Sequence, residues 1–145
     1  MPRKNLLDLN VLIALTDSEH PHYFRAQKWF DSGGKDSWGI CPLTESGFLR
    51  VTTNPVFRSS FRTLEQALAI LQSLKEYPGY WYWKIDESWV ALTAQFAARI
   101  SGHRQVTDAY LLGLAIKENG VLVTFDKGIK YMAGADFARN LLILE

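Results

Sequence analysis

Four acidic residues occupy positions where folding alone gives little reason for a carboxylate. Asp8 lies inside the apolar run LLDLNVLIAL, and Asp126 directly follows the apolar run VLVTF. Glu45 and Asp108 each fall in the first turn of a predicted helix. Burying a carboxylate is costly unless it is hydrogen-bonded, paired or bound to a cation. If the four acids converge, their mutual repulsion predicts a counter-cation.

The donor set indicates which cation and which chemistry. Oxygen ligands without a set of Cys or His favour Mg²⁺ or Mn²⁺ over zinc. Such a cation on a carboxylate rim suits phosphodiester hydrolysis, because it polarises the phosphoryl oxygen, lowers the pKa of an attacking water and stabilises the leaving oxygen. Asn10 either hydrogen-bonds a carboxylate or metal water, or caps a helix. Thr107 is the predicted cap of the helix that carries Asp108, and a second candidate to support the site.

Each acid taken singly also has an ordinary structural explanation. An acid near a helix N-terminus complements the helix dipole, which covers Glu45 and Asp108. Asp126 could be a turn residue before Lys127-Gly128, and Asp8 could cap the helix that begins near Asn10. The combination of all four is what favours a site.

The predicted elements would bring these acids to one edge of the molecule. Short strands that alternate with helices predict an α/β fold, a mainly parallel sheet with helices on both faces. The expected strands are Asn5–Asp8, Ser37–Cys41, Val121–Phe125 and Leu141–Leu144. Ligands bind beyond the carboxyl ends of parallel strands, which is where Asp8 and Asp126 would lie.

Helices are expected between these strands. One helix begins near Asn10, and others span His22–Phe30, Pro42 to about Thr53, and Thr63 to about Glu76. A further helix is capped by Asp86 or Ser88 and has an apolar stripe of Trp89, Leu92, Phe96 and Ile100. The last spans Thr107–Asn119. The pattern Thr63-Leu-Glu-Gln66 predicts a capping box, with Leu64, Leu68, Leu71 and Leu74 facing inward. Gly120 is expected to end the last of these helices.

Composition sets outer limits on the function. The chain has 145 residues, of which 48% are hydrophobic and 21% are charged, so we expect one globular domain over residues 1–145. A net charge of +1 argues against a general polyanion binder but allows a local basic rim. The lone Cys41 is expected to be a buried hydrophobe in a reducing cytoplasm, and no apolar run is long enough to span a membrane.

Four stretches resemble the PIN-domain family and, within it, the VapC toxins of VapBC toxin–antitoxin systems. The matching stretches are LLDLNVLIAL, CPLTESGFLRVTTNP, VTDAYLLGLA and VLVTFDKGI. Their order and spacing match along nearly the whole chain. No stretch is diagnostic alone, but four in this order are fairly specific.

The resemblance implies a three-layer PIN-like fold and a Mg²⁺ or Mn²⁺ site on Asp8, Glu45, Asp108 and Asp126. It implies endonuclease cleavage of structured RNA, usually tRNA or rRNA, with a 5′-phosphate product. In sites of this kind the last acid, here Asp126, often acts through water. The resemblance also implies a homodimer and a VapB-like antitoxin whose tail enters the active-site groove.

Other features permit two interpretations. The aromatic run Tyr80-Trp81-Tyr82-Trp83 could stack unpaired bases, but packing against a neighbouring segment, a dimer mate or an antitoxin is the favoured interpretation. Several basic residues could contact phosphates or simply be solvated, with Lys127 and Lys130 favoured because they follow Asp126; the full set is Arg50, Arg58, Arg62, Lys84, Arg104, Lys127 and Lys130. His20, His22 and His103 lack metal-ligand spacing, and we assign them no catalytic role.

Two other functions would use a similar pattern. A Mg²⁺-dependent phosphohydrolase or phosphotransfer domain also places an Asp after its first strand, but a haloacid-dehalogenase-like enzyme would have Asp at position 10, and a receiver domain would have adjacent acids before its first helix. A catalytically silent binding module would be expected to lose some of the acids. All four acids are present, which favours the nuclease.

Overall fold

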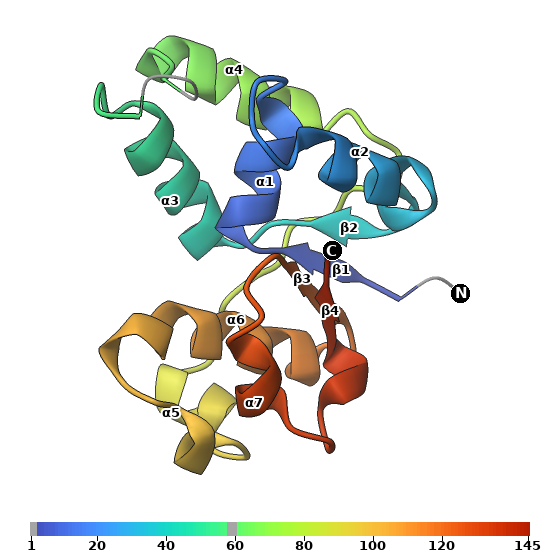
Figure 1. Cartoon of the computed structure of the whole chain (residues 1–145), viewed down its shortest axis with the longest axis vertical. Helices are drawn as coiled ribbons and strands as arrows, with labels where there is room; N and C mark the ends of the chain where they lie inside the picture. Colours follow the sequence, from blue (N-terminus) through green and yellow to red (C-terminus); the bar gives the residue numbers. More distant parts are fainter. Residues whose placement is uncertain (1–2, 58–60) are drawn as a thin grey trace.

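A computed structural model describes residues 3–57 and 61–145 of the chain (Figure 1). In these ranges four parallel strands form one sheet in the order β2-β1-β3-β4. The strands are β1 (Asn5–Leu7), β2 (Trp38–Gly39), β3 (Val121–Thr124) and β4 (Leu141–Ile143). All four lie within the predicted ranges. The register pairs Leu7 with Val123, so Asp8 and Thr124 follow at the same edge of the sheet.

Helices cover both faces of this sheet, as the alternating pattern predicted (Figure 1). On one face lie α1 (Leu9–Thr16), α2 (Tyr23–Asp31), α3 (Pro42–Thr52) and α4 (Leu64–Leu74). On the other lie α5 (Trp89–Thr93), α6 (Val106–Lys117) and α7 (Ile129–Ala133). The structure therefore confirms the three-layer α/β fold.

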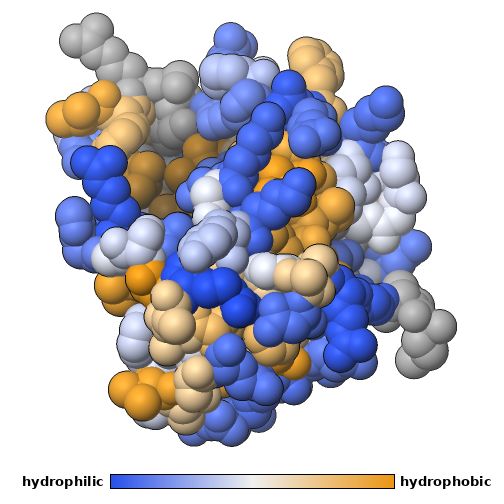
Figure 2. Space-filling model, turned by 60° about the horizontal axis from the view of Figure 1, so that its bottom comes forward, coloured by the Kyte–Doolittle hydropathy of each residue, from blue (hydrophilic) through white to orange (hydrophobic). Residues whose placement is uncertain are grey.

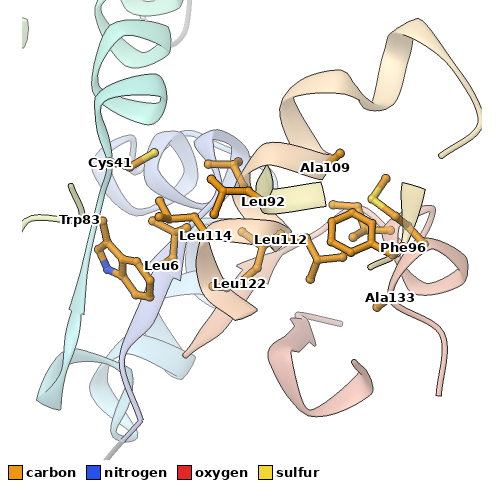
Figure 3. Close-up of a cluster of buried hydrophobic side chains, with 14 residues drawn as sticks. Leu6, Cys41, Trp83, Leu92, Phe96, Ala109, Leu112, Leu114, Leu122 and Ala133 are labelled. Atoms are coloured by element: carbon orange, nitrogen blue, oxygen red, sulfur yellow. The ribbon is translucent and has the colours of Figure 1, made fainter. Parts of the chain in front are cut away.

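Each face has its own hydrophobic core, because successive strand residues point to opposite sides. Leu6 and Leu122 are buried with Leu112 and Leu114 of α6, as Figure 3 shows. The next residue of each strand, Leu7 and Val123, belongs to the core under α1 to α4. The sheet is thus buried on both faces, which explains its apolar strands.

The structure corrects several boundaries and faces. The Thr63–Gln66 capping box is present, but Leu64 and Leu68 of α4 are exposed while Ala67 and Leu71 are buried. The inward face is therefore shifted around the helix relative to the predicted leucine stripe. Gln105, not Thr107, is the N-cap residue of α6, and it uses no side-chain cap.

The expected long helix after Ser88 is broken. Ser88 caps α5 through a hydrogen bond from the Ala91 N–H, and Asp86 instead pairs with Lys117. After Thr93 the chain continues as turns, with a short 3₁₀ turn at Ala97–Arg99, although Leu92 and Phe96 are buried as the apolar stripe predicted.

The end of α6 also differs from the prediction. α6 ends at Lys117, and the left-handed residue after it is Asn119, with a φ of 53°, rather than Gly120. At Gly120 the requirement is close packing instead: a Cβ there would lie 2.5 Å from the Lys4 carbonyl oxygen.

The aromatic run packs along a neighbouring strand, as the favoured interpretation expected, although Tyr82 is exposed. It runs beside β2, with hydrogen bonds from the Trp81 N–H to the Trp38 carbonyl and from the Trp83 N–H to the Ile40 carbonyl. Trp83 is fully buried and stacks on Trp81 at 4.6 Å between ring centroids. Cys41 is also fully buried, as expected for a small core residue.

The described surface mixes apolar and polar side chains. Figure 2 shows hydrophobic patches separated by hydrophilic side chains on the face in view. Among the described helices, none combines the length and apolar character that crossing a bilayer requires.

Candidate active site

Asp8 sits at the junction of β1 and α1 and is held there by two hydrogen bonds. Its Oδ1 accepts from the Leu9 N–H at 2.7 Å, and its Oδ2 accepts from the Thr124 hydroxyl at 2.8 Å. The Asp8 side chain caps α1, so the predicted capping role of this acid is confirmed. Burial nevertheless raises the pKa of Asp8 above its ordinary value, and Asp126 raises it further, while the two hydrogen bonds lower it. Capping alone does not offset the cost of burying this carboxylate.

Asp108 lies near Asp8 and Asp126, in the first turn of α6. Its pKa is raised to about 7 by burial, by Asp8 and by Asp126, in that order of size. Within the described residues, none of these three acids forms an ion pair with a lysine or arginine. Tertiary folding therefore brings three carboxylates from distant segments together without a basic side chain to neutralise them.

Asp126 follows β3 and is the most exposed of the three. Its Oδ1 accepts a hydrogen bond from the Gly128 N–H at 2.8 Å, and its own N–H donates to the Thr124 hydroxyl at 3.0 Å. The predicted turn role is present, and it orients the carboxylate at the same edge as Asp8. Asp126 can therefore both stabilise the turn and belong to the acidic site.

Thr124 is the site residue that sequence reasoning missed. Its fully buried hydroxyl donates to Asp8, accepts from the Asp126 N–H, and accepts from the Asn10 side chain at 3.4 Å. A threonine that ends an apolar strand two residues before an acid was the available signal. Its β-branched side chain is also typical of a buried strand, so the strand pattern alone does not distinguish its hydroxyl as functional.

The two predicted supporting residues behave differently. Asn10 lies inside α1 rather than at its cap, and its Oδ1 accepts from the Phe125 N–H at 3.4 Å while its amide reaches Thr124. Asn10 thus joins the end of β3 to α1 beside Asp8. Thr107 is exposed, and no hydrogen bond of its side chain occurs among the described residues.

Glu45 is not grouped electrostatically with the other three acids. It lies in the first turn of α3, next to Thr44, whose hydroxyl donates to the Leu7 carbonyl at 3.2 Å. The tyrosines of the aromatic run are its titratable neighbours: burial and the Glu45 carboxylate raise the pKa of Tyr80 to about 12. Glu45 does not contribute to the raised pKa of Asp8 or Asp108.

The predicted substrate-binding residues Lys127, Lys130 and Arg104 are exposed, and the pocket that the two lysines line does not include the acids. Lys127 and Lys130 are exposed and line a pocket of about 580 Å³ between α7 and β4. Arg104 is exposed on the short 3₁₀ turn His103–Gln105 that precedes α6. Arg58 lies outside the described residues.

The acidic group fits a divalent cation by charge and by donor type. Over residues 3–57 and 61–145, no three His, Cys, Asp or Glu side chains are close enough to ligate one ion as they stand. Asp8, Asp108 and Asp126 nevertheless offer only oxygen donors, and their repulsion is unrelieved, which favours a hard cation over zinc.

Sequence comparisons connect the chain to known proteins. The family model described as "PIN domain" matches residues 6–135. Ribonuclease VapC38 of Mycobacterium tuberculosis is 41% identical over 128 residues, which cover 88% of this chain and 89% of the relative. Ribonuclease VapC39 of the same organism is 36% identical over 136 residues, covering 94% and 98%.

Structural comparisons find the same architecture. A chain in the crystal structure of VapBC2 from Rickettsia felis, bound to a promoter DNA fragment, superposes with a TM-score of 0.65 at 15% identity, covering 97% of this chain and 98% of that one. A chain of FitAcB from Neisseria gonorrhoeae superposes with a TM-score of 0.62 at 18% identity, covering 97% and 96%. At these identities the likeness supports the fold alone.

Proposed function

The chain belongs to the PIN-domain family, and from that premise we propose that it is a metal-dependent endoribonuclease of the VapC kind. The observation that carries the proposal is the convergence of Asp8, Asp108 and Asp126, none of which forms an ion pair within the described residues. The relatives named as ribonucleases, at up to 41% identity, support RNA as the substrate. Structured RNA, such as tRNA or rRNA, is the substrate class that the family resemblance favours.

Asp8 and Asp108 hold a Mg²⁺ or Mn²⁺ ion in this proposal, with Asp126 and Glu45 completing the acidic set. When bound, the ion polarises the phosphoryl oxygen and lowers the pKa of the attacking water. Thr124 keeps the Asp8 carboxylate turned toward the edge of the sheet. Water attacks the RNA phosphodiester in line with the leaving 3′-oxygen, so the product carries a 5′-phosphate.

The proposal also assigns residues to RNA binding and names the protein partners. Lys127, Lys130 and Arg104 are exposed near the acids in sequence, and we assign them to RNA phosphates. The partner in this proposal is a VapB-like antitoxin, which the resemblance to VapC toxins implies and which the names VapBC2 and FitAcB of the structural neighbours match. A homodimer and a cytoplasmic location complete the proposal.

The test is cleavage of total RNA by the purified protein with Mg²⁺, with Mn²⁺ or with EDTA. Discrete fragments should require the metal and disappear in Asp8→Asn, because that change removes a ligand while keeping the side-chain volume. Glu65→Gln is the matched control, since Glu65 is an exposed helix-start acid on α4, away from the site. Equal cleavage by the wild type and by Asp8→Asn would overturn the proposal.

A further inference from the structure

Three aromatic rings, those of His20, His22 and Phe125, lie close together next to the chain segment that carries Asp126. The His22 ring stacks on Phe125, with 4.8 Å between ring centroids and an interplanar angle of 29°. The His20 ring lies 5.6 Å from the His22 ring in a tilted arrangement. Phe125 stands between Thr124 and Asp126, and its N–H donates to Asn10. The group of rings therefore begins on the segment that carries Asp126.

The loop between α1 and α2 is built to hold these rings. Asp17 is buried, and its carboxylate accepts from the Glu19 N–H at 3.0 Å, while its carbonyl accepts from the His20 N–H. The His20 Nδ1 accepts from the His22 N–H at 3.0 Å. Burial and the neighbouring His22 lower the pKa of His20, which favours the unprotonated Nδ1 that this bond requires. Both histidines are thus fixed by the loop backbone.

Folding makes little use of the His22 side chain itself. His22 occupies the N-cap position of α2 but forms no side-chain cap, and among the described residues no hydrogen bond engages its imidazole. His22 and Phe125 are only half-buried. Phe125 covers one side of the His22 ring and His20 lies close to it, so the surface available to a further ring is the part of the His22 and Phe125 rings that stays open to solvent.

We propose that His22 and Phe125 form a base-stacking site for an unpaired nucleotide next to the cleaved phosphodiester. This inference rests on the proposed ribonuclease function and specifies its substrate: RNA that is single-stranded or locally opened at the cut. Sequence-tolerant stacking on aromatic rings is how proteins hold unpaired bases, whereas the bases of a continuous duplex have their faces covered. The site orients the RNA and takes no part in the bond-breaking step.

The test separates stacking from packing with three substitutions at one position. His22→Ala removes the ring, His22→Leu keeps an apolar contact on Phe125 without a flat face, and His22→Phe restores a ring. The KM for metal-dependent RNA cleavage should rise roughly 5- to 150-fold in His22→Ala, the range seen when one stacking residue is removed, with kcat largely retained. His22→Leu should resemble His22→Ala, and His22→Phe should resemble the wild type.

Binding of a labelled short unstructured RNA to the Asp8→Asn protein, with and without His22→Ala, gives a readout that needs no catalysis. Phe24→Ala is the control, because Phe24 is an exposed aromatic residue of the same helix whose ring contact is with Tyr23. RNA cleavage that His22→Ala leaves unchanged would overturn the stacking site while the ribonuclease stands. Rescue by leucine, or an equal loss in Phe24→Ala, would also overturn it. Absence of metal-dependent cleavage in the wild type would instead count against the ribonuclease.

Discussion

At the scale of single residues, Asp8 and Asp108 are buried or half-buried acids with very few polar partners. Asp8 is 7% exposed and receives two hydrogen bonds, whereas no hydrogen bond to the Asp108 carboxylate occurs among the described residues. Burial raises the pKa of Asp108 to about 7 with no hydrogen bond among the described residues to lower it, whereas two hydrogen bonds lower the pKa of Asp8. Such a carboxylate lowers the stability of the metal-free protein once it is ionised.

This cost predicts how stability depends on pH. The pKa of Asp108 in the folded protein is about 7, above its ordinary value of 3.8. Between these values the folded state binds more protons than the unfolded state, so the free energy of unfolding falls as pH rises. In metal-free buffer Asp108→Asn should be more stable than the wild type by about 1 kcal/mol at about pH 8, a figure discounted for partial exposure. Below about pH 4 the difference should vanish.

Denaturant unfolding in EDTA at both pH values measures this difference. Glu65→Gln, the exposed acid of α4, serves as the control and should show no comparable pH-dependent gain. A gain in Asp108→Asn that is the same at both pH values would contradict the raised pKa.

Thr124 provides a second prediction at the residue scale. Thr124→Val removes the hydroxyl that joins Asp8, Asn10 and the Asp126 N–H. Loss of this buried partner should cost about 1–3 kcal/mol of stability and abolish RNA cleavage, because Asp8 is no longer held in place. Thr124→Ser keeps the hydroxyl and should retain most of the activity. Full cleavage by the valine variant would show that the site does not depend on this network.

At the scale of elements, close packing of α5 on α6 depends on Gly113. A Cβ at this buried position would lie 2.5 Å from the Leu92 carbonyl oxygen, which belongs to the backbone of α5. α6 carries Asp108 at its first turn and packs on the sheet below β1 and β3, so its position also sets the position of that acid.

Gly113→Ala should therefore destabilise the protein, although alanine is favoured over glycine within a helix by about 1 kcal/mol. The expected loss is about 1–3 kcal/mol, because backbone atoms must move to admit the methyl group. Gly47→Ala in α3 is the matched control: its nearest contact, at 3.0 Å, is the end of the Leu9 side chain, which can move. Thermal unfolding of both variants measures the difference, and equal stability would contradict it.

At the scale of the whole molecule, the site depends on segments that are far apart in the chain. Asp8 belongs to the junction of β1 and α1, Asp108 to α6 on the opposite face, and Asp126 to the end of β3. A cation held between them would bind the folded state and not the unfolded chain. Metal binding should therefore stabilise the whole domain rather than one loop.

Adding Mg²⁺ or Mn²⁺ to the metal-free protein should raise its Tm with increasing metal concentration. A concentration near 100 times the Kd would add about 2.7 kcal/mol of stability. EDTA should reverse the rise, and the rise should be lost in Asp8→Asn and in Asp108→Asn. A Tm that responds equally to metal in the wild type and in both variants would place metal binding elsewhere.

Much of the architecture could be predicted because it depends on local patterns. Apolar runs such as VLVTF identified the buried strands, and Thr63 with Gln66 identified a helix start through chemistry within one turn. The α/β class, the order of the elements and the candidate acids follow from signals of this short range. The buried side of a helix was harder to predict. In α4, Leu64 and Leu68 are exposed because the packing neighbours, not the leucine spacing, decide which side of the helix is covered.

The sequence alone thus determined which residue types were available and which elements carry them. Tertiary structure decided which of them meet: it grouped Asp8 with Asp108 and Asp126, placed Glu45 beside Tyr80, and set the Thr124 hydroxyl between the acids. It also stacked His22 on Phe125, more than a hundred positions along the chain. The physical reason is that burial and electrostatic repulsion depend on distance in space, and only the register of the strands and the packing of helices on the sheet set that distance.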